Sequence, residues 1–101
     1  MANLTKNQAR ARAKKIRETL EDQLTNIQDQ AEELRNLAEE MREEGDNIEP
    51  YEGKEDLTEQ QEERMEWLNE QADTLEEQAD QLDTLASDLE ETISNLEEID
   101  F

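Results

Sequence analysis

Two chemically versatile residues are missing from this chain of 101 residues, which contains no cysteine and no histidine. Without cysteine there is no disulfide and no thiolate nucleophile. Without histidine, the usual general base and the commonest transition-metal ligand are gone. Neighbouring carboxylates such as Glu76 and Glu77 are frequent, but they fall at outward helix positions where no apolar pocket would activate them. We therefore expect a protein that is not an enzyme and that has no catalytic residue, cofactor or metal site.

Glycine and proline are almost as scarce, since Gly45, Pro50 and Gly53 are the only ones. Pro50 disfavours helix at the residue before it, and glycine tolerates left-handed backbone. This stretch therefore predicts a connector over residues 45–57, with a left-handed helix cap at Gly45. The connector is acidic but does not match a calcium-binding EF-hand loop, because Ile48 and Pro50 stand where oxygen ligands are needed.

Long hydrophobic runs are absent as well, since only 32% of the residues are hydrophobic and 41% are charged. No segment approaches the ~18 apolar residues that indicate a membrane span, and the basic N-terminal stretch lacks the apolar block of a signal peptide. We expect no membrane contact and a cytoplasmic location, in a host cell if the protein is viral. With so few apolar residues, their spacing along the chain decides the fold.

The apolar residues that are present recur with strict regularity. Between Met65 and Leu96 they alternate in steps of three and four, which places them on one narrow stripe of an α-helix. Over four or more heptads this pattern is typical of a coiled-coil seam, built from the a and d positions of each heptad. The a series is Met65, Ala72, Ala79, Ala86 and Ile93, and the d series is Leu68, Leu75, Leu82, Leu89 and Leu96.

A similar stripe precedes the connector. Its d series is Ala13, Leu20, Ile27, Leu34 and Met41, and its a series includes Leu24, Ala31 and Ala38. Thr5 and Gln8 predict a capping box at the helix start, and Asp56 or Thr58 can cap the second helix. We expect one all-α domain over residues 1–101, a long antiparallel coiled-coil hairpin with helices at 6–44 and 58–98. Ile99 and Phe101 would form a short apolar tail.

The charge distribution favours an antiparallel rather than a parallel pair of helices. Residues 6–17 hold six basic and no acidic residues, whereas residues 84–101 hold six acidic and no basic ones. A fold at Tyr51 pairs residues whose numbers add up to about 102–103, which brings the basic start beside the acidic end and neutralises it. In this register large residues face each other in several layers, such as Leu34 and Leu68, while Ala31 faces Ala72 and would allow close helix approach.

The positions beside the seam differ between its two sides. The g side, which we call the uncharged flank, comprises Ile16, Gln23, Gln30, Leu37, Gln71, Gln78, Leu85 and Thr92. The e side, which we call the charged flank, comprises Lys14, Glu21, Arg35, Arg42, Glu76, Asp83, Glu90 and Glu97. Because a two-helix hairpin buries little surface, we expect the uncharged flank to cover a second copy. The product would be a homodimeric four-helix bundle with Ile16, Leu37 and Leu85 in self-association. Alternatively, glutamine stands there only as a good helix former.

The net charge of −21, from 31 acidic and 10 basic residues, indicates a partner with a basic surface. The two helices place about 26 acids along about 60 Å, roughly one per 2.3 Å, close to the one charge per ≈1.7 Å of duplex DNA. We therefore expect a protein-binding modulator that mimics nucleic-acid charge and blocks a nucleic-acid-binding protein, without itself binding nucleic acid. The candidate partner-binding residues are Glu32, Glu33, Glu39, Glu40, Glu62, Glu63, Glu66, Trp67, Asp73, Glu76 and Glu77.

In charge, size and cysteine-free composition, the chain resembles the small acidic mimics among phage-encoded anti-restriction and anti-CRISPR inhibitors. The main alternative is a structural coiled-coil scaffold or spacer in a larger assembly such as a virion, which would explain the seam and the uncharged flank equally well. A third interpretation is that the acidity serves solubility in high salt. Trp67, at an outward position near the connector, is expected either to anchor a partner or to pack against Tyr51, Ile48 or another subunit.

Overall fold

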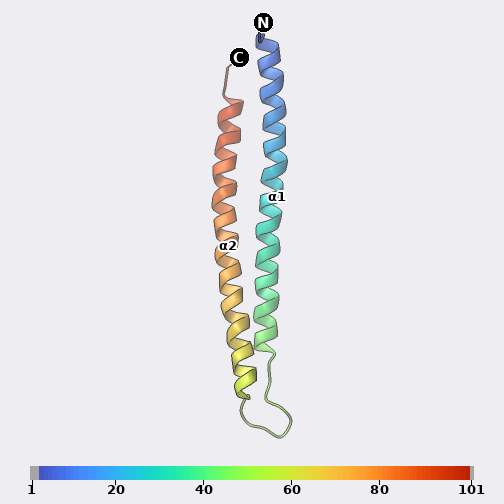
Figure 1. Ribbon diagram of the computed structural model, residues 1–101, viewed down its shortest axis with the longest axis vertical. Helices are drawn as coiled ribbons and strands as arrows, with labels where there is room; N and C mark the ends of the chain where they lie inside the picture. The colour runs from blue at the N-terminus through green and yellow to red at the C-terminus, as the bar shows by residue number, and fades with distance from the viewer. Residues whose placement is uncertain (1–2, 101) are drawn as a thin grey trace.

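The computed structural model describes residues 3–100 and contains two long α-helices and no strand among those residues. α1 runs over Lys6–Asp46 and α2 over Glu59–Glu97. Figure 1 shows them side by side and antiparallel, with both chain ends at one end of the rod and the connector at the other. The predicted all-α helical hairpin is confirmed as a rod of 82 × 20 × 16 Å. The expected tail residue Phe101 lies outside the described residues.

Both helices begin at a threonine with the same hydrogen-bond pattern. The Thr5 N–H donates to Gln8 Oε1 at 3.0 Å, and the Gln8 N–H donates to Thr5 Oγ1 at 3.1 Å. Thr58 and Gln61 repeat this capping box at 2.9 and 3.1 Å. Each box satisfies backbone donors that the first turn of a helix leaves unpaired, which is why both helices start where the sequence predicts. Of the two caps expected for the second helix, the structure uses Thr58.

The predicted left-handed cap at Gly45 is wrong. α1 continues through this residue, and Asn47 ends the helix in a right-handed conformation with φ −87° and ψ −2°. Gly45 is buried, and a Cβ built on it would lie 3.7 Å from Leu68 Cβ. The glycine therefore occupies an a position of the seam, in series with Ala31 and Ala38, rather than the end of the helix.

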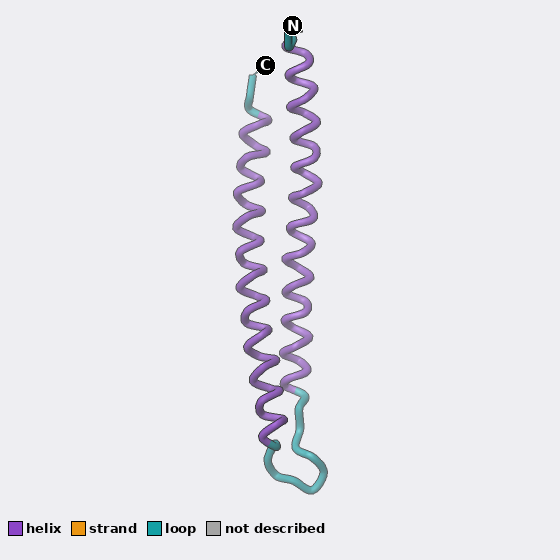
Figure 2. Tube along the Cα trace, in the orientation of Figure 1, coloured by secondary structure: helices purple, strands orange, loops and turns teal. Residues whose placement is uncertain are grey.

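The connector first continues in the direction of α1, alongside the start of α2, and then turns. Ile48 is half-buried, and Gln61 Nε2 donates to the backbone oxygen of Glu49 at 2.8 Å, so the first connector residues lie beside the first turns of α2. Figure 2 shows this segment followed by a wide loop. The loop contains a turn closed by the Lys54 N–H, which donates to the Tyr51 backbone oxygen at 2.9 Å. Gly53 supplies the positive φ of 82° that the turn requires.

Most of the buried side chains are alanines, and all of them lie in the predicted a and d series. Among the described residues, the buried hydrophobic ones are Ala31, Ala38, Leu68, Ala72, Ala79, Ala86 and Ile93. Alanine lets two helix backbones approach closely, so a leucine from the other helix can fill the space beside it. The heptad seam is thus present, but most of its buried positions hold alanine rather than a large residue.

The register predicted from a fold at Tyr51 is wrong. Gly45 lies beside Leu68, so seam residues whose numbers add up to about 113 are level with each other. Leu34 is then level with Ala79 instead of Leu68. The reason is the asymmetric connector, because α2 begins about two turns beyond the end of α1 (Figure 1). Large residues therefore face alanines in this part of the seam.

Candidate protein-interaction surfaces

Two arginines of α1 each hold two carboxylates of α2 on the charged flank. The ion pairs are Arg35 with Asp80 and Asp83, and Arg42 with Asp73 and Glu76. The Nη2–Oδ1 distances are 2.9 Å to Asp80 and 2.6 Å to Asp73. The two clusters are related by one heptad in each helix. They therefore close the charged flank along two successive heptads.

These contacts raise the pKa of both guanidinium groups. For Arg35 the main cause is the hydrogen bond to Asp83, followed by that to Asp80. For Arg42 it is the hydrogen bond to Glu76 and then that to Asp73. The arginine side chains remain 39% and 33% exposed, so water screens the pairs. Such pairs select orientation and register more than they add stability.

The structure divides the candidate partner-binding residues among several faces. All of them are exposed, but Asp73 and Glu76 are engaged by Arg42. Heptad geometry places the others in three groups: Glu32, Glu39, Glu62 and Glu66 beside the charged flank, Glu33, Glu40 and Trp67 beside the uncharged flank, and Glu63 and Glu77 on the outer face of α2. The candidate residues therefore do not form one continuous patch.

The uncharged flank is wider than its g positions alone. The g positions of the two helices do lie together, because Arg64 binds Glu44 across them. The c positions lie next to the g positions around a helix. In α2 every acid except Asp88 occupies a b, e or f position, so the c and g positions form a nearly neutral half of the helix. A wheel projection that included the c positions would have found Thr74 and Gln81 in α2, and Thr19 and Asn26 in α1, where the other c positions are the charged Arg12, Glu33 and Glu40.

Large apolar side chains are exposed on and beside the uncharged flank. Ile16 is 57% exposed, Leu37 46% and Leu85 51%, in agreement with their outward g positions. Trp67 is 52% exposed at a neighbouring c position, so packing against the rest of the hairpin does not cover it. These residues are spread along one side of the rod, with glutamine and threonine between them.

The seam itself is open on the same side. The d leucines lie between the a and g positions, and most of them are only half-buried: Leu20, Leu34, Leu75, Leu82, Leu89 and Leu96. The a alanines, which adjoin the charged flank, are buried. The hairpin therefore encloses the alanine side of its seam, beneath the arginine pairs, and leaves the leucine side partly exposed next to the uncharged flank.

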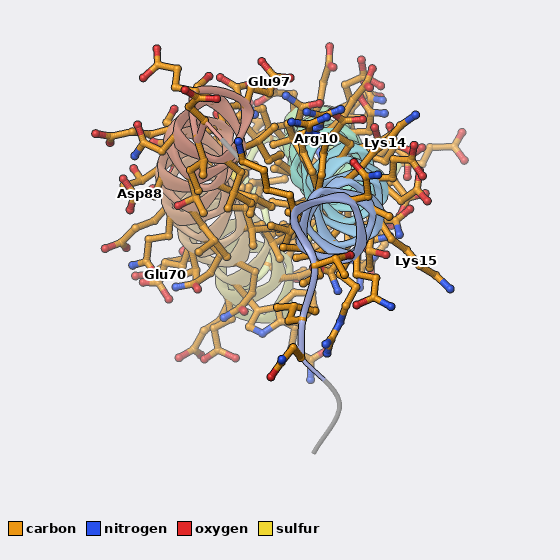
Figure 3. The ribbon with its side chains drawn as sticks, turned by 90° about the horizontal axis from the view of Figure 1, so that it is seen from above. Arg10, Lys14, Lys15, Glu70, Asp88 and Glu97 are labelled. Atoms are coloured by element: carbon orange, nitrogen blue, oxygen red, sulfur yellow. The ribbon has the colours of Figure 1, made fainter. Side chains whose placement is uncertain are left out.

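The basic segment 6–17 is not neutralised by α2 as the sequence predicted. Within residues 3–100, no ion pair joins this segment to α2, and Arg17 has its carboxylate partner, Glu21, at 3.7 Å on its own helix. The corrected register explains this, because Leu96 is level with Arg17 and most of the segment projects beyond the end of α2. Figure 3 shows Arg10 on the same side of the hairpin as Glu97, while Lys15 lies on the side of α1 away from α2.

Neither helix of the described chain has an apolar stretch long enough to cross a membrane. No group of three or more metal-ligating side chains occurs within residues 3–100. Comparison of the chain with protein-family models, curated proteins and solved structures found no match.

Proposed function

We propose that this chain is a non-enzymatic, homodimeric protein-binding module that occupies the basic groove of a nucleic-acid-binding protein in the cytoplasm. The observation that carries the proposal is the density of exposed acid along a straight rod. The 31 acids along 82 Å correspond to about one per 2.6 Å, against one charge per ≈1.7 Å on duplex DNA. A basic groove shaped for a straight polyanion would attract such a surface from a distance.

The first turns of α2 are the part best suited to this contact. Glu62, Glu63 and Glu66 are exposed and none of them has an ion-pair partner within residues 3–100. Farther along the rod, by contrast, Arg42 neutralises part of the charge of Asp73 and Glu76. The partner would therefore bind near the connector end, in the manner of phage-type anti-restriction or anti-CRISPR inhibitors.

The test is capture of partners from nuclease-treated lysate of a candidate host, with the chain immobilised. We expect a bound protein that elutes as salt is raised and is displaced by duplex DNA, because phosphate and carboxylate compete for one groove. Changing Glu62, Glu63 and Glu66 to Gln should abolish capture. The matched control removes three charges at the other end, Glu90, Glu91 and Glu97, and should retain it. Equal binding by both variants, or a complex insensitive to DNA, would refute the mimicry.

A structural scaffold or spacer is the second candidate function, and the open leucine side of the seam favours it. An assembly held through apolar contacts would persist as salt is raised, because screening weakens charge contacts but not apolar burial. The same capture experiment therefore separates the two functions. A partner that stays bound at high salt and is lost on changing Leu85 to Glu would support the scaffold.

A further inference from the structure

We propose that two copies associate as antiparallel rods, with α1 of one copy against α1 of the other and the two-fold axis near Asn26 and Ile27. This inference rests on the homodimer of the proposed function and assigns its geometry. The face involved is the uncharged flank, together with the half-buried leucines that the hairpin leaves open.

A second copy fits this face better than a short ligand does. The exposed apolar residues Ile16, Leu37 and Leu85 are spread over several turns of the rod, with glutamine and threonine between them. An occupant must therefore be long, apolar at matching intervals and free of charge where it makes contact. The uncharged flank of another copy has these properties and the same length.

The charges of α1 select the antiparallel orientation. Residues 6–17 are basic without any acid, whereas residues 32–46 contain seven acids and only two bases, Arg35 and Arg42. With α1 against α1, a parallel orientation of the two helices would bring like charge against like charge. Antiparallel rods bring the basic segment, which projects beyond α2, beside the acidic half of the other α1. Opposite charges at both ends then fix the orientation, and the uncharged g positions between them make the contact.

Heptad spacing sets the register within this orientation. The g residues of α1 recur every seven positions, so antiparallel copies keep g beside g when the paired residue numbers add up to 46, 53 or 60, and of these only 53 pairs Ile16 with Leu37. Ile16 then contacts Leu37 of the second copy, and two-fold symmetry repeats this contact at the other end. Gln23 faces Gln30 between them, and Arg12 comes beside Glu40 of the second copy.

Disulfide cross-linking tests the arrangement cleanly because the chain has no cysteine of its own. We expect a mixture of the Ile16→Cys and Leu37→Cys variants to form a covalent heterodimer on oxidation, while neither variant links to itself. In this register residue 16 of one copy is level with residue 37 of the other, so two identical cysteines lie about 31 Å apart along the rod at 1.5 Å per residue. A disulfide needs Cα atoms within ~7 Å of each other. The matched control is a mixture of Lys15→Cys and Asn36→Cys, which have the same spacing on the outer face of α1 and should not link.

Sedimentation equilibrium of the parent protein separates failure of this arrangement from failure of the dimer. A parent that is dimeric but gives no Ile16→Cys to Leu37→Cys link would overturn the antiparallel geometry alone. Self-linking of Ile16→Cys would do the same and would indicate parallel rods. A parent that stays monomeric at micromolar concentration would overturn both proposals. Circular dichroism of each variant confirms that the helices are intact, and these exposed positions should tolerate cysteine.

Discussion

Replacement of Gly45 by alanine is expected to stabilise the protein, although the position is buried. A Cβ there would lie 3.5 Å from Asn69 Oδ1 and 3.7 Å from Leu68 Cβ, both ordinary van der Waals distances. Glycine inside a helix costs about 1 kcal/mol relative to alanine. Gly45 lies one residue before the end of α1, which reduces this gain, while burial of a methyl group contributes up to about 0.8 kcal/mol. We therefore expect a net gain of about 1 kcal/mol.

Thermal unfolding followed by circular dichroism at fixed protein concentration measures this effect. A gain of 1 kcal/mol raises the melting temperature of a domain of this size by about 4–8 °C. Gly53→Ala is the matched control and should lower it, because its φ of 82° strains any residue with a Cβ. A lower melting temperature for Gly45→Ala would show that the space beside Leu68 does not admit a methyl group, and the expected gain would be refuted.

Three further predictions concern the stability of the hairpin. Leu68→Ala should cost about 2–5 kcal/mol because Leu68 is buried, and Leu75→Ala, at a half-buried position, should cost less. Equal costs in urea unfolding at low protein concentration would contradict this order. The melting temperature should rise as salt is added from very low ionic strength, because the net charge of −21 repels itself; a steady fall would show that ion pairs dominate. Since the pKa values of Arg35 and Arg42 are raised, the stability from their pairs is complete below the ordinary arginine pKa and is lost only above it. With no histidine present, we expect a nearly constant melting temperature between about pH 6 and pH 9, and a sharp transition in that range would contradict this assignment.

The helices, their starts and their seam could be predicted because they depend on local patterns. The capping boxes at Thr5 and Thr58 involve residues three apart, and the heptad stripe needs only the spacing of apolar residues. Both signals depend on the local sequence and not on what the helices pack against. The end of α1 was less predictable, because Gly45 could either cap the helix or lie in the seam, and only its contact with Leu68 decides between these roles.

The register could not be predicted from the same repeat. Apolar residues recur at a and d about every half heptad, so the two stripes can pack together in several registers. A shift of α2 by eleven residues replaces leucine–leucine layers by leucine–alanine layers and keeps both stripes in contact. The arginine pairs and the connector path distinguish these registers. This choice also determines the candidate site, since it neutralises Asp73 and Glu76 and leaves residues 6–17 beyond the end of α2.

The charge density of the charged flanks depends on whether two copies associate through their uncharged flanks. One rod carries about one acid per 2.6 Å, which is sparser than the one charge per ≈1.7 Å of DNA. Two antiparallel rods joined through their uncharged flanks would carry about one acid per 1.3 Å over the same length, with the charged flanks outward. On this reasoning, mimicry depends on the dimer.

Leu37→Glu therefore has opposite expected effects under two models. If single rods bind the basic partner, the added carboxylate should strengthen binding. If the dimer binds, the same substitution breaks the interface and should weaken binding despite the extra negative charge. Titration of the captured partner with parent and variant, each checked by sedimentation, measures the sign directly. Stronger binding by a monomeric Leu37→Glu variant would separate the two proposals and leave the uncharged flank without a role in partner recognition.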